Sequence, residues 1–197
     1  VEADLRMGLD TDAGAMLLAQ SDLTGPDRAD ETEFMAEAFR THGATEVFAT
    51  DDPDEGEQFT MARRAAFTSL GKVGTLLLED VGVPLPSLPR LVAGIEEISA
   101  RRDVPIALVA HAGDGNTHPI IVLTDDDPDR ADRARLAFGE VMDLAIGMGG
   151  TITGEHGVGR LKAPWLPAQL GDDVMALTRR IKNALDPQGI LNPGTML

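Results

Sequence analysis

A short glycine-rich turn between two apolar segments places the strongest constraint on how this chain can fold. Residues 104–110 are apolar and β-branched, residues 113–116 read Gly-Asp-Gly-Asn, and residues 119–123 are apolar again. Apolar segments on both sides of residues that accept positive φ are typical of a β-hairpin. The sequence therefore predicts two adjacent antiparallel strands here.

A histidine stands on each side of this turn. If the hairpin pairs symmetrically, with a loop at 114–115 or 113–116, His111 lies directly opposite His118. Directly opposed residues have Cβ atoms about 4.5–5.5 Å apart, so both imidazoles could reach one divalent cation. A single histidine at a strand end is more often a hydrogen-bonded structural residue. Two histidines in this register favour a metal or catalytic site.

A second histidine-containing block follows at residues 154–159, which read Gly-Glu-His-Gly-Val-Gly. Three of the four histidines of the chain lie in these two blocks. A carboxylate commonly completes a set of three protein ligands and leaves a position open for water or substrate. Glu155 is therefore the expected third ligand. His156 is left as a proton acceptor, because imidazole exchanges a proton near neutral pH.

Charge and composition exclude several classes of function. The 197 residues carry a net charge of −16, which argues against nucleic-acid binding because phosphate contacts need clustered Lys and Arg. We interpret the acidic segments 51–55 and 125–129 as a solubilising surface. The chain has no Cys, so a metal must be held by nitrogen and oxygen atoms, which suit zinc, manganese and iron. No apolar run approaches the roughly 20 residues of a membrane helix, and we expect a soluble, cytoplasmic protein without a transmembrane segment.

Hydropathy patterns predict helices that alternate with short strands. Apolar residues at helical spacing predict helices over 27–42, 55–70, 87–101, 129–148 and 172–185. Ser87 is the expected N-cap of the third of these helices. Apolar runs predict strands at 15–19, 46–49 and 76–81, in addition to the hairpin. This order indicates an α+β domain with an antiparallel sheet that helices cover on one face.

Three blocks together resemble one family of flavoenzymes. They are residues 111–118, residues 154–159 with Lys162, and the tail Asp-Pro-Gln-Gly-Ile-Leu-Asn-Pro-Gly at 186–194. The chain is similar to the C-terminal part of the FAD-linked 2-hydroxy-acid oxidoreductases, which include the flavin subunit of glycolate oxidase, D-lactate dehydrogenase and D-2-hydroxyglutarate dehydrogenase. The resemblance implies a ferredoxin-like cap or substrate domain over 1–150. It also implies a C-terminal loop and helices over 151–197 that pack on an FAD-binding domain.

The resemblance further implies an activity, the oxidation of a D-2-hydroxy acid to the 2-oxo acid. His111, His118 and Glu155 would hold a divalent metal, with zinc and manganese as the favoured candidates. His156 would take the hydroxyl proton while a hydride leaves for the flavin. FAD would be bound mainly by an N-terminal domain that these residues do not contain. We therefore expect a piece of a longer protein that is inactive alone.

Four further residues have roles implied by the resemblance. Arg63 matches the family's arginine for the substrate carboxylate, although an Arg-Arg pair on a helix is usually solvated and Thr60 stands where the family often has a tryptophan. Asn116 is either a substrate-contacting amide or a turn residue. Lys162 either binds the anionic substrate or covers apolar surface. Asn192 either contacts the isoalloxazine ring of FAD or serves a turn.

Two other classes of function are compatible with the same residues. One is a free-standing metal-binding or partner-docking domain without redox activity, and the other is a metallohydrolase that uses the three ligands to activate water. An exposed apolar surface where a flavin domain docks would favour the oxidoreductase, whereas turnover without flavin would favour the hydrolase. The expected partners are a small-molecule 2-hydroxy acid and the FAD-binding domain, and a homo-oligomer is compatible with the sequence.

Overall fold

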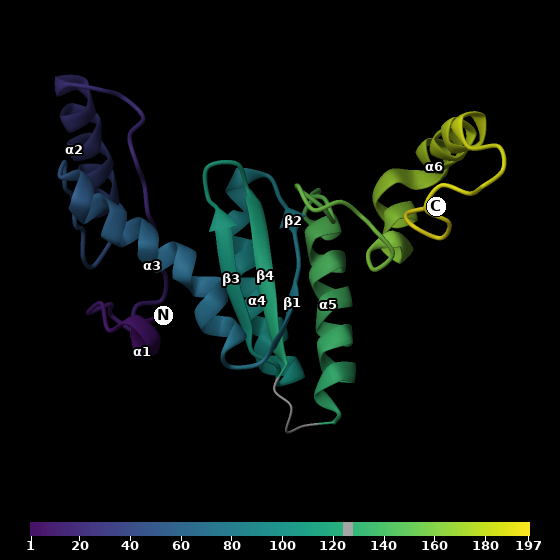
Figure 1. Ribbon diagram of the computed structural model, residues 1–197, viewed down its shortest axis with the longest axis horizontal. Helices are drawn as coiled ribbons and strands as arrows, with labels where there is room; N and C mark the ends of the chain where they lie inside the picture. The colour runs from purple at the N-terminus through teal and green to yellow at the C-terminus, as the bar shows by residue number, and fades with distance from the viewer. Residues whose placement is uncertain (124–127) are drawn as a thin grey trace. The chain divides into compact units, whose positions relative to one another are not determined.

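The computed structural model describes residues 1–123 and 128–197, which form two compact units, Val1–Lys72 and Val73–Leu197 (Figure 1). Within these residues, six α-helices and a four-stranded antiparallel sheet confirm the predicted α+β class. Residues 125–127 of the second predicted acidic surface lie outside the described residues.

Helices make up the regular structure of the described first unit. They are α1 (Glu2–Leu5), α2 (Pro26–Thr41) and α3 (Pro53–Gly71). Proline opens both α2 and α3, a position where its missing N–H removes no helical hydrogen bond. The Asp52 side chain caps α3 by accepting hydrogen bonds from the amides of Asp54 and Glu55. The two longer helices confirm the helices predicted over 27–42 and 55–70.

The two strands predicted for this unit are wrong. Residues 15–19 and 46–49 have no regular secondary structure. Their large side chains are exposed, Leu17 by 63% and Phe48 by 84%. A strand becomes stable when it pairs with neighbours and buries a face, and the described residues of this unit give neither segment a paired strand. An apolar run in the sequence shows only that a segment is hydrophobic. It does not show that another strand lies beside the segment to pair with it.

The sheet of the second unit is built around its longest strand, β4 (Asn116–Leu123). β3 (Ile106–His111) pairs along one side of it, and β1 (Thr75–Leu78) and β2 (Val81–Gly82) pair along the other, all antiparallel. β1 and β2 keep one register and form a single edge strand, interrupted opposite Pro119, which has no N–H to donate. The predicted hairpin and the predicted strand at 76–81 are both confirmed.

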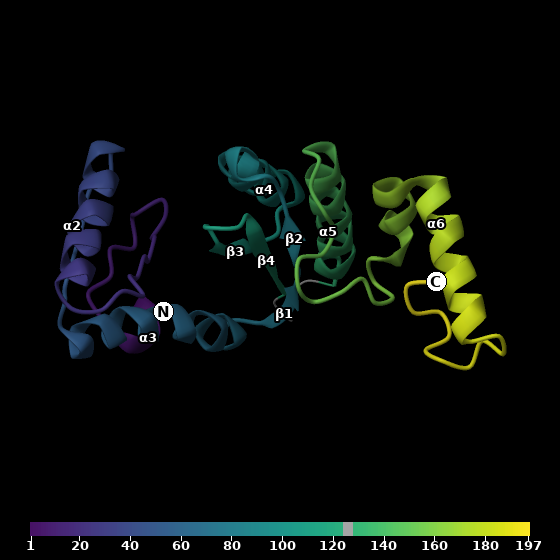
Figure 2. The same ribbon diagram turned by 90° about the horizontal axis from the view of Figure 1, so that it is seen from above.

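Side-chain alternation gives this sheet two different faces. Val81 and Ile121 share one buried core with α4 (Leu88–Arg102) and α5 (Arg130–Gly147), which lie side by side (Figures 1 and 2). His118 lies at an odd spacing from Ile121 along β4 and therefore faces away from this core. The helices contribute Leu91, Ile95, Ile98, Ala134, Ala137, Phe138, Val141, Met142 and Ala145 to the core.

Short helical turns lead into the helices of this unit. The 3-10 turn η1 (Leu85–Ser87) precedes α4, and Ser87 occupies the N-cap position without the expected side-chain hydrogen bond. The 3-10 turn η2 (Ala163–Trp165) leads into α6 (Leu166–Leu185). Gly171, with φ of 75°, breaks α6, so its second part is the helix predicted at 172–185. None of the described helices is long and apolar enough to cross a membrane.

Candidate metal and catalytic site

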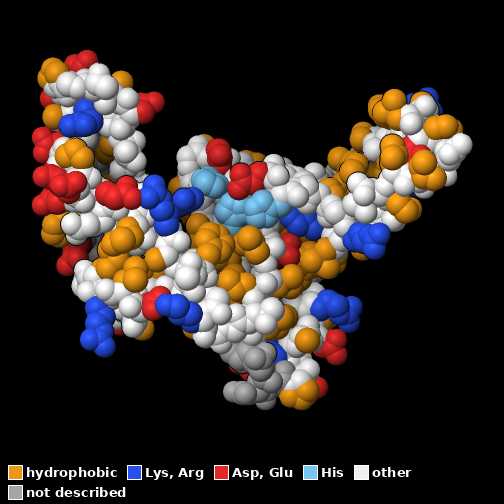
Figure 3. All heavy atoms as spheres, in the orientation of Figure 1, with side chains coloured by type: hydrophobic (Ala, Val, Ile, Leu, Met, Phe, Trp, Pro, Cys, Tyr) orange, Lys and Arg blue, Asp and Glu red, His pale blue; other side chains and the backbone are white. Residues whose placement is uncertain are grey.

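The three predicted metal ligands converge at one end of the sheet. Nε2 of His118 lies 3.1 Å from Oε1 of Glu155, and Nε2 of His111 lies 3.8 Å from the same oxygen. One ligand atom from each residue falls within 4.8 Å of the others. Histidine side chains gather beside acidic ones on the face shown in Figure 3. Two strands and one loop thus supply a nitrogen, nitrogen and oxygen donor set.

The register of the hairpin differs from the predicted one. His111 pairs with Asn116, and His118 pairs with Val109, so the two histidines are not directly opposite each other. The connecting loop spans residues 112–115. A register shift of two residues keeps each side chain on the face that symmetric pairing gives it, whereas a shift of one would reverse it. The imidazoles therefore still meet, with ring centroids 5.4 Å apart.

The ligands differ strongly in burial. The His118 side chain is 6% exposed, whereas those of His111 and Glu155 are 42% and 55% exposed. Nδ1 of His118 is buried and has no hydrogen-bond partner in the described part of the chain. A buried polar atom of this kind normally has a partner. The ring nitrogen that faces the other candidate ligands is Nε2, 3.1 Å from Oε1 of Glu155, so Nε2 is the atom that could bind a metal ion.

His156 adds a third imidazole to the group. Its ring stacks on that of His118 with centroids 5.0 Å apart and an interplanar angle of 17°. Nε2 of His156 lies 3.9 Å from Oε1 of Glu155. Its side chain is 40% exposed, so a bound molecule can reach it. His156 thus stands at the edge of the candidate metal centre, as a proton acceptor should.

Asp80 holds the loop that carries Glu155 and His156, and sequence reasoning did not single it out. Its buried carboxylate accepts hydrogen bonds from the amide of His156 at 2.8 Å and from the hydroxyl of Thr153 at 2.7 Å. The amides of Gly154 and Glu155 donate to it at 2.9 and 3.0 Å. Burial alone would raise the pKa of Asp80, but these hydrogen bonds outweigh it and lower the pKa to about 2.

A buried lysine lies beside the acidic pair Glu79 and Asp80 in the edge strand. Nζ of Lys162 donates to the backbone carbonyl of Asp80 at 2.9 Å and lies 3.8 Å from Oε2 of Glu79. Burial raises the pKa of Glu79 to about 7 against the attraction of Lys162, and the charge of Asp80 adds to the rise. The expectation that Lys162 meets the substrate stays a prediction. Its observed partners belong to the edge strand.

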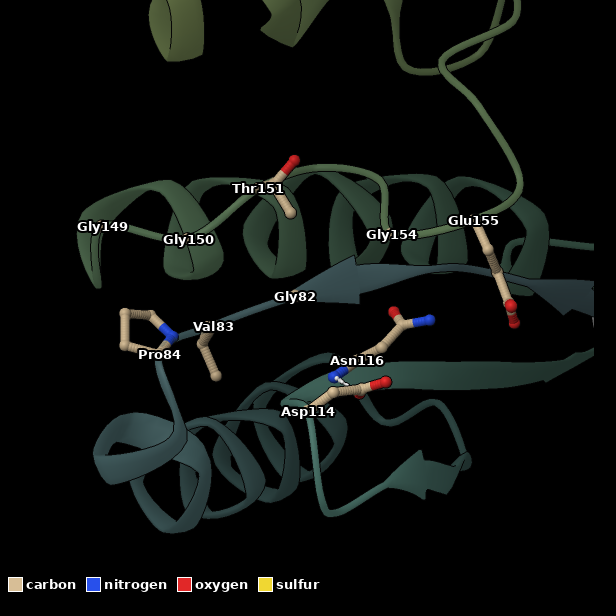
Figure 4. A pocket seen from close by; sticks show the side chains of 10 residues that line it. All are labelled: Gly82, Val83, Pro84, Asp114, Asn116, Gly149, Gly150, Thr151, Gly154 and Glu155. Atoms are coloured by element: carbon tan, nitrogen blue, oxygen red, sulfur yellow. Dashed lines mark hydrogen bonds between the residues drawn. The ribbon is translucent and has the colours of Figure 1, made fainter.

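A cavity of about 530 Å³ adjoins the ligand group. Figure 4 shows the side chains of Asn116 and Glu155 directed into the space between the loop and the hairpin. A side chain at Gly154 would have to displace that of Asn116, because a Cβ there would lie 2.8 Å from Nδ2 of Asn116. The lining is Gly82, Val83, Pro84, Asp114, Asn116, Gly149, Gly150, Thr151, Gly154 and Glu155. These described lining residues include two carboxylates and no Lys or Arg.

Two predicted site residues, Arg63 and Asn192, belong neither to the candidate metal ligands nor to the cavity lining. Arg63 is an exposed residue of α3 in the first unit. Asn192, with φ of 47°, occupies a turn in the tail, where its carbonyl accepts a hydrogen bond from the amide of Thr195 at 3.1 Å. The turn function proposed for Asn192 is therefore present. Its contact with a flavin and the role of Arg63 stay predictions.

Two imidazoles and a carboxylate around one space, with a third imidazole stacked beside them, define a candidate metal and acid–base centre on an α+β domain. Residues 1–196 match the family described as "FAD linked oxidases, C-terminal domain". The chain therefore belongs to this family, which confirms the resemblance found in the sequence motifs.

Individual relatives give the extent of the match. The chain is 39% identical over 199 residues to "Glycolate oxidase subunit GlcD" of Bacillus subtilis (strain 168), covering 100% of this chain and 42% of the relative. The protein of the same name from Escherichia coli (strain K12) is 35% identical over 191 residues, which cover 96% and 38%. The mitochondrial D-lactate dehydrogenase (cytochrome) of Arabidopsis thaliana is 28% identical over 171 residues, which cover 85% and 30%. The chain spans less than half the length of these relatives.

Proposed function

We propose that this chain is the C-terminal part of an FAD-dependent oxidoreductase that converts a D-2-hydroxy acid into the 2-oxo acid. One observation carries the proposal. His111, His118 and Glu155 converge within 4.8 Å, and His156 stacks beside them, in a chain that belongs to the FAD-linked oxidases. Oxidation of an alcohol removes a proton and a hydride, so it requires a proton acceptor as well as a flavin.

The donor set fits a divalent cation. Imidazole and carboxylate groups suit zinc and manganese, and Nε2 of His111 and Nε2 of His118 lie 3.8 and 3.1 Å from Oε1 of Glu155. His111, His118 and Glu155 would hold the ion. When bound, the ion would make the 2-hydroxyl of the substrate more acidic and fix the orientation of its C2–H bond.

His156 would receive the hydroxyl proton at Nε2, the ring nitrogen 3.9 Å from Oε1 of Glu155. Stacking on His118 orients the ring, and the exposed position of the side chain leaves room for substrate. FAD, when bound, would accept the hydride from C2. In this proposal FAD is held mainly by an N-terminal domain of the longer protein.

Other residues would bind the substrate and the flavin. The guanidinium of Arg63 would pair with the substrate carboxylate, as a planar fork matches two oxygens. Asn116 points into the cavity and would contact the substrate, and Lys162 would add positive charge near its anionic end. Asn192 would contact the isoalloxazine ring.

We further propose that two parts of the chain have different roles. Residues 1–150 would form a ferredoxin-like cap, and residues 151–197 would pack on the FAD-binding domain. Exposed apolar residues recur at three- and four-residue spacing along α6 and continue into the tail, as expected for an uncovered docking surface. They are Val174, Leu177, Ile181, Leu185, Ile190 and Leu191. Figure 3 shows hydrophobic side chains at this C-terminal end of the molecule.

The test joins the chain to the flavin-binding segment and mixes the FAD-loaded protein anaerobically with glycolate, D-lactate or D-2-hydroxyglutarate. We expect bleaching of the flavin absorbance with at least one acid, and a loss of about 100-fold or more in the rate for His156→Gln, since a general base contributes about 10²–10⁴-fold. A loaded protein that binds metal but shows no bleaching with any acid would favour the alternative, a metal-binding or docking domain without redox activity. Hydrolytic turnover by the protein without flavin would favour the other alternative, a metallohydrolase.

A further inference from the structure

The carboxylate of Asp80 is completely buried and is surrounded by the loop that follows Thr151. Oδ1 accepts the amide of Gly154 at 2.9 Å, and Oδ2 accepts the amides of Glu155 at 3.0 Å and His156 at 2.8 Å. One side chain in the edge strand therefore binds three consecutive backbone amides far along the chain.

The sheet explains why Asp80 can reach this loop. Asp80 lies between β1 and β2, whose common register places it beside His118 of β4 and on the same face of the sheet. The next segment is fixed to the same edge, because Thr151 and Gly82 exchange backbone hydrogen bonds of 2.8 and 3.0 Å. The loop then turns back over Asp80, which brings Glu155 to within 3.1 Å of His118.

A second layer of contacts closes the loop around Asp80. The Thr153 hydroxyl donates to Oδ2 of Asp80 at 2.7 Å and accepts the amide of Gly157 at 2.8 Å. On the other side, Lys162 donates to the Asp80 carbonyl at 2.9 Å, and its ammonium lies 3.7 Å from Oδ2. A buried carboxylate is costly unless hydrogen bonds and a counter-charge compensate for its lost hydration. Asp80 has both.

We propose that Asp80 is the positioning residue of this site, whose carboxylate fixes the backbone of residues 153–156 so that Glu155 completes the metal ligands and His156 stacks on His118. The inference rests on the proposed function, because it assigns a purpose to the geometry of the proposed ligand and base. Asp80 touches neither the metal nor the substrate in this scheme. It acts through the loop, in the way that groups behind metal ligands commonly orient them.

Glu79 provides a matched control for this proposal. It is adjacent to Asp80, equally buried, and close to the same Lys162. Its carboxylate oxygens have no hydrogen-bond partner among the described residues. A purely structural effect of altering the buried acidic pair would appear in both Asp80→Asn and Glu79→Gln. An effect on the loop and the ligands should appear only in Asp80→Asn. Asparagine replaces one carboxylate oxygen by an NH₂ group, which cannot accept a hydrogen bond from the loop amides.

The experiment has two arms on the same purified proteins. In the first, amide hydrogen exchange is measured in EDTA. We expect the amides of Gly154, Glu155 and His156 to lose about tenfold or more of their protection in Asp80→Asn while the core amides of α4 and α5 keep theirs. In the second, Zn²⁺ and Mn²⁺ are titrated by calorimetry, and we expect affinity to fall about 10- to 100-fold in Asp80→Asn. Glu79→Gln should match the wild type in both arms.

The outcomes separate this proposal from the proposed function. Unchanged loop protection and affinity in Asp80→Asn, or equal losses in Glu79→Gln, would overturn the positioning role. A wild-type protein that binds neither cation would remove the metal from the proposed function, while the exchange arm would still decide on Asp80. If Asp80→Asn does not fold, Thr153→Val removes one hydrogen bond from the same carboxylate. We expect it to fold and to lose part of the loop protection, and full protection in this variant would also overturn the proposal.

Discussion

Nε2 of the buried His118 lies 3.1 Å from Oε1 of Glu155, a side chain that is more than half exposed. The two residues belong to different kinds of structure. His118 sits in the central strand, whose position is fixed by neighbours on both sides, whereas Glu155 sits in a loop that depends on Asp80. The candidate metal centre thus combines a rigid half, supplied by the hairpin, with a half that must be positioned separately.

This arrangement predicts that His118 is required for metal binding. His118→Ala should reduce Zn²⁺ affinity by more than about 100-fold, since changes behind a ligand already cost about 10- to 100-fold. His42→Ala is the control, because the exposed His42 ends α2 and its Nδ1 lies 2.8 Å from the carbonyl of Ala38. Calorimetric titration of both variants measures the difference, with folding checked by circular dichroism. Equal affinity in the two variants would contradict the metal centre.

The buried carboxyl of Glu79 predicts a specific dependence of stability on pH. Burial raises its pKa from the usual 4.5 to about 7 in the folded chain. Between these values the folded chain therefore binds more protons than the unfolded chain, and the free energy of unfolding falls as pH rises. At about 1.36 kcal/mol per pKa unit, the full effect is on the order of 3 kcal/mol.

Glu79→Gln removes this titration. Urea unfolding in EDTA at pH 5 and pH 8 should show a smaller loss of stability across this range in Glu79→Gln than in the wild type. The stability of the variant relative to that of the wild type should therefore increase as pH rises. The same pH dependence in both proteins would mean that Glu79 is ionised in the folded chain throughout this range.

Gly150 predicts a steric limit at the wall of the cavity. A Cβ at this position would lie 2.8 Å from the carbonyl oxygen of Ala145 and closer still to that of Gly82. Both contacts are to backbone, so Gly150→Ala should destabilise the fold by about 1–3 kcal/mol or more. Gly56→Ala in α3 meets nothing within 4 Å, and should stabilise by about 0.5–1 kcal/mol. Thermal unfolding of both variants checks the contrast, and similar shifts would contradict it.

The hairpin and its histidines could be predicted from the sequence because local patterns carry this information. Apolar segments on both sides of a glycine-rich turn identify two paired strands. The register could not be predicted, since it depends on which residues enter the loop. The observed pairing of His111 with Asn116 differs from the expected one by an even number of residues, so the face of both histidines was predicted correctly.

Asp80 shows what local patterns leave out. The only signal in the sequence is an acidic pair, Glu79-Asp80, inside the apolar segment 76–81. That signal marks a buried charge that needs partners, but not which partners. The partners are amides in a loop far along the chain, and only the fold brings them together. The failed strands at 15–19 and 46–49 have the same origin, because strand formation depends on a neighbour that the segment does not itself encode.

Arg63 and Arg64 are adjacent on α3 and offer the sharpest test of the proposed substrate contact. Both are exposed, and Nη1 of Arg64 is paired with Oε1 of Glu57 at 2.6 Å. We propose that Arg63 binds the substrate carboxylate, so Arg63→Gln in the FAD-loaded longer protein should lower kcat/KM for the preferred hydroxy acid. Loss of a charge-assisted hydrogen bond worth about 1.5–3 kcal/mol corresponds to a decrease of roughly 10- to 150-fold.

Arg64→Gln removes the same charge from the same helix but breaks only an exposed ion pair, which contributes about 0–1 kcal/mol to stability. It should leave kcat/KM nearly unchanged. Steady-state kinetics on both variants therefore distinguishes a specific carboxylate contact from a general effect of positive charge in a protein of net charge −16. Equal decreases in the two variants would indicate the general effect, and the assignment of Arg63 to the substrate would then be wrong.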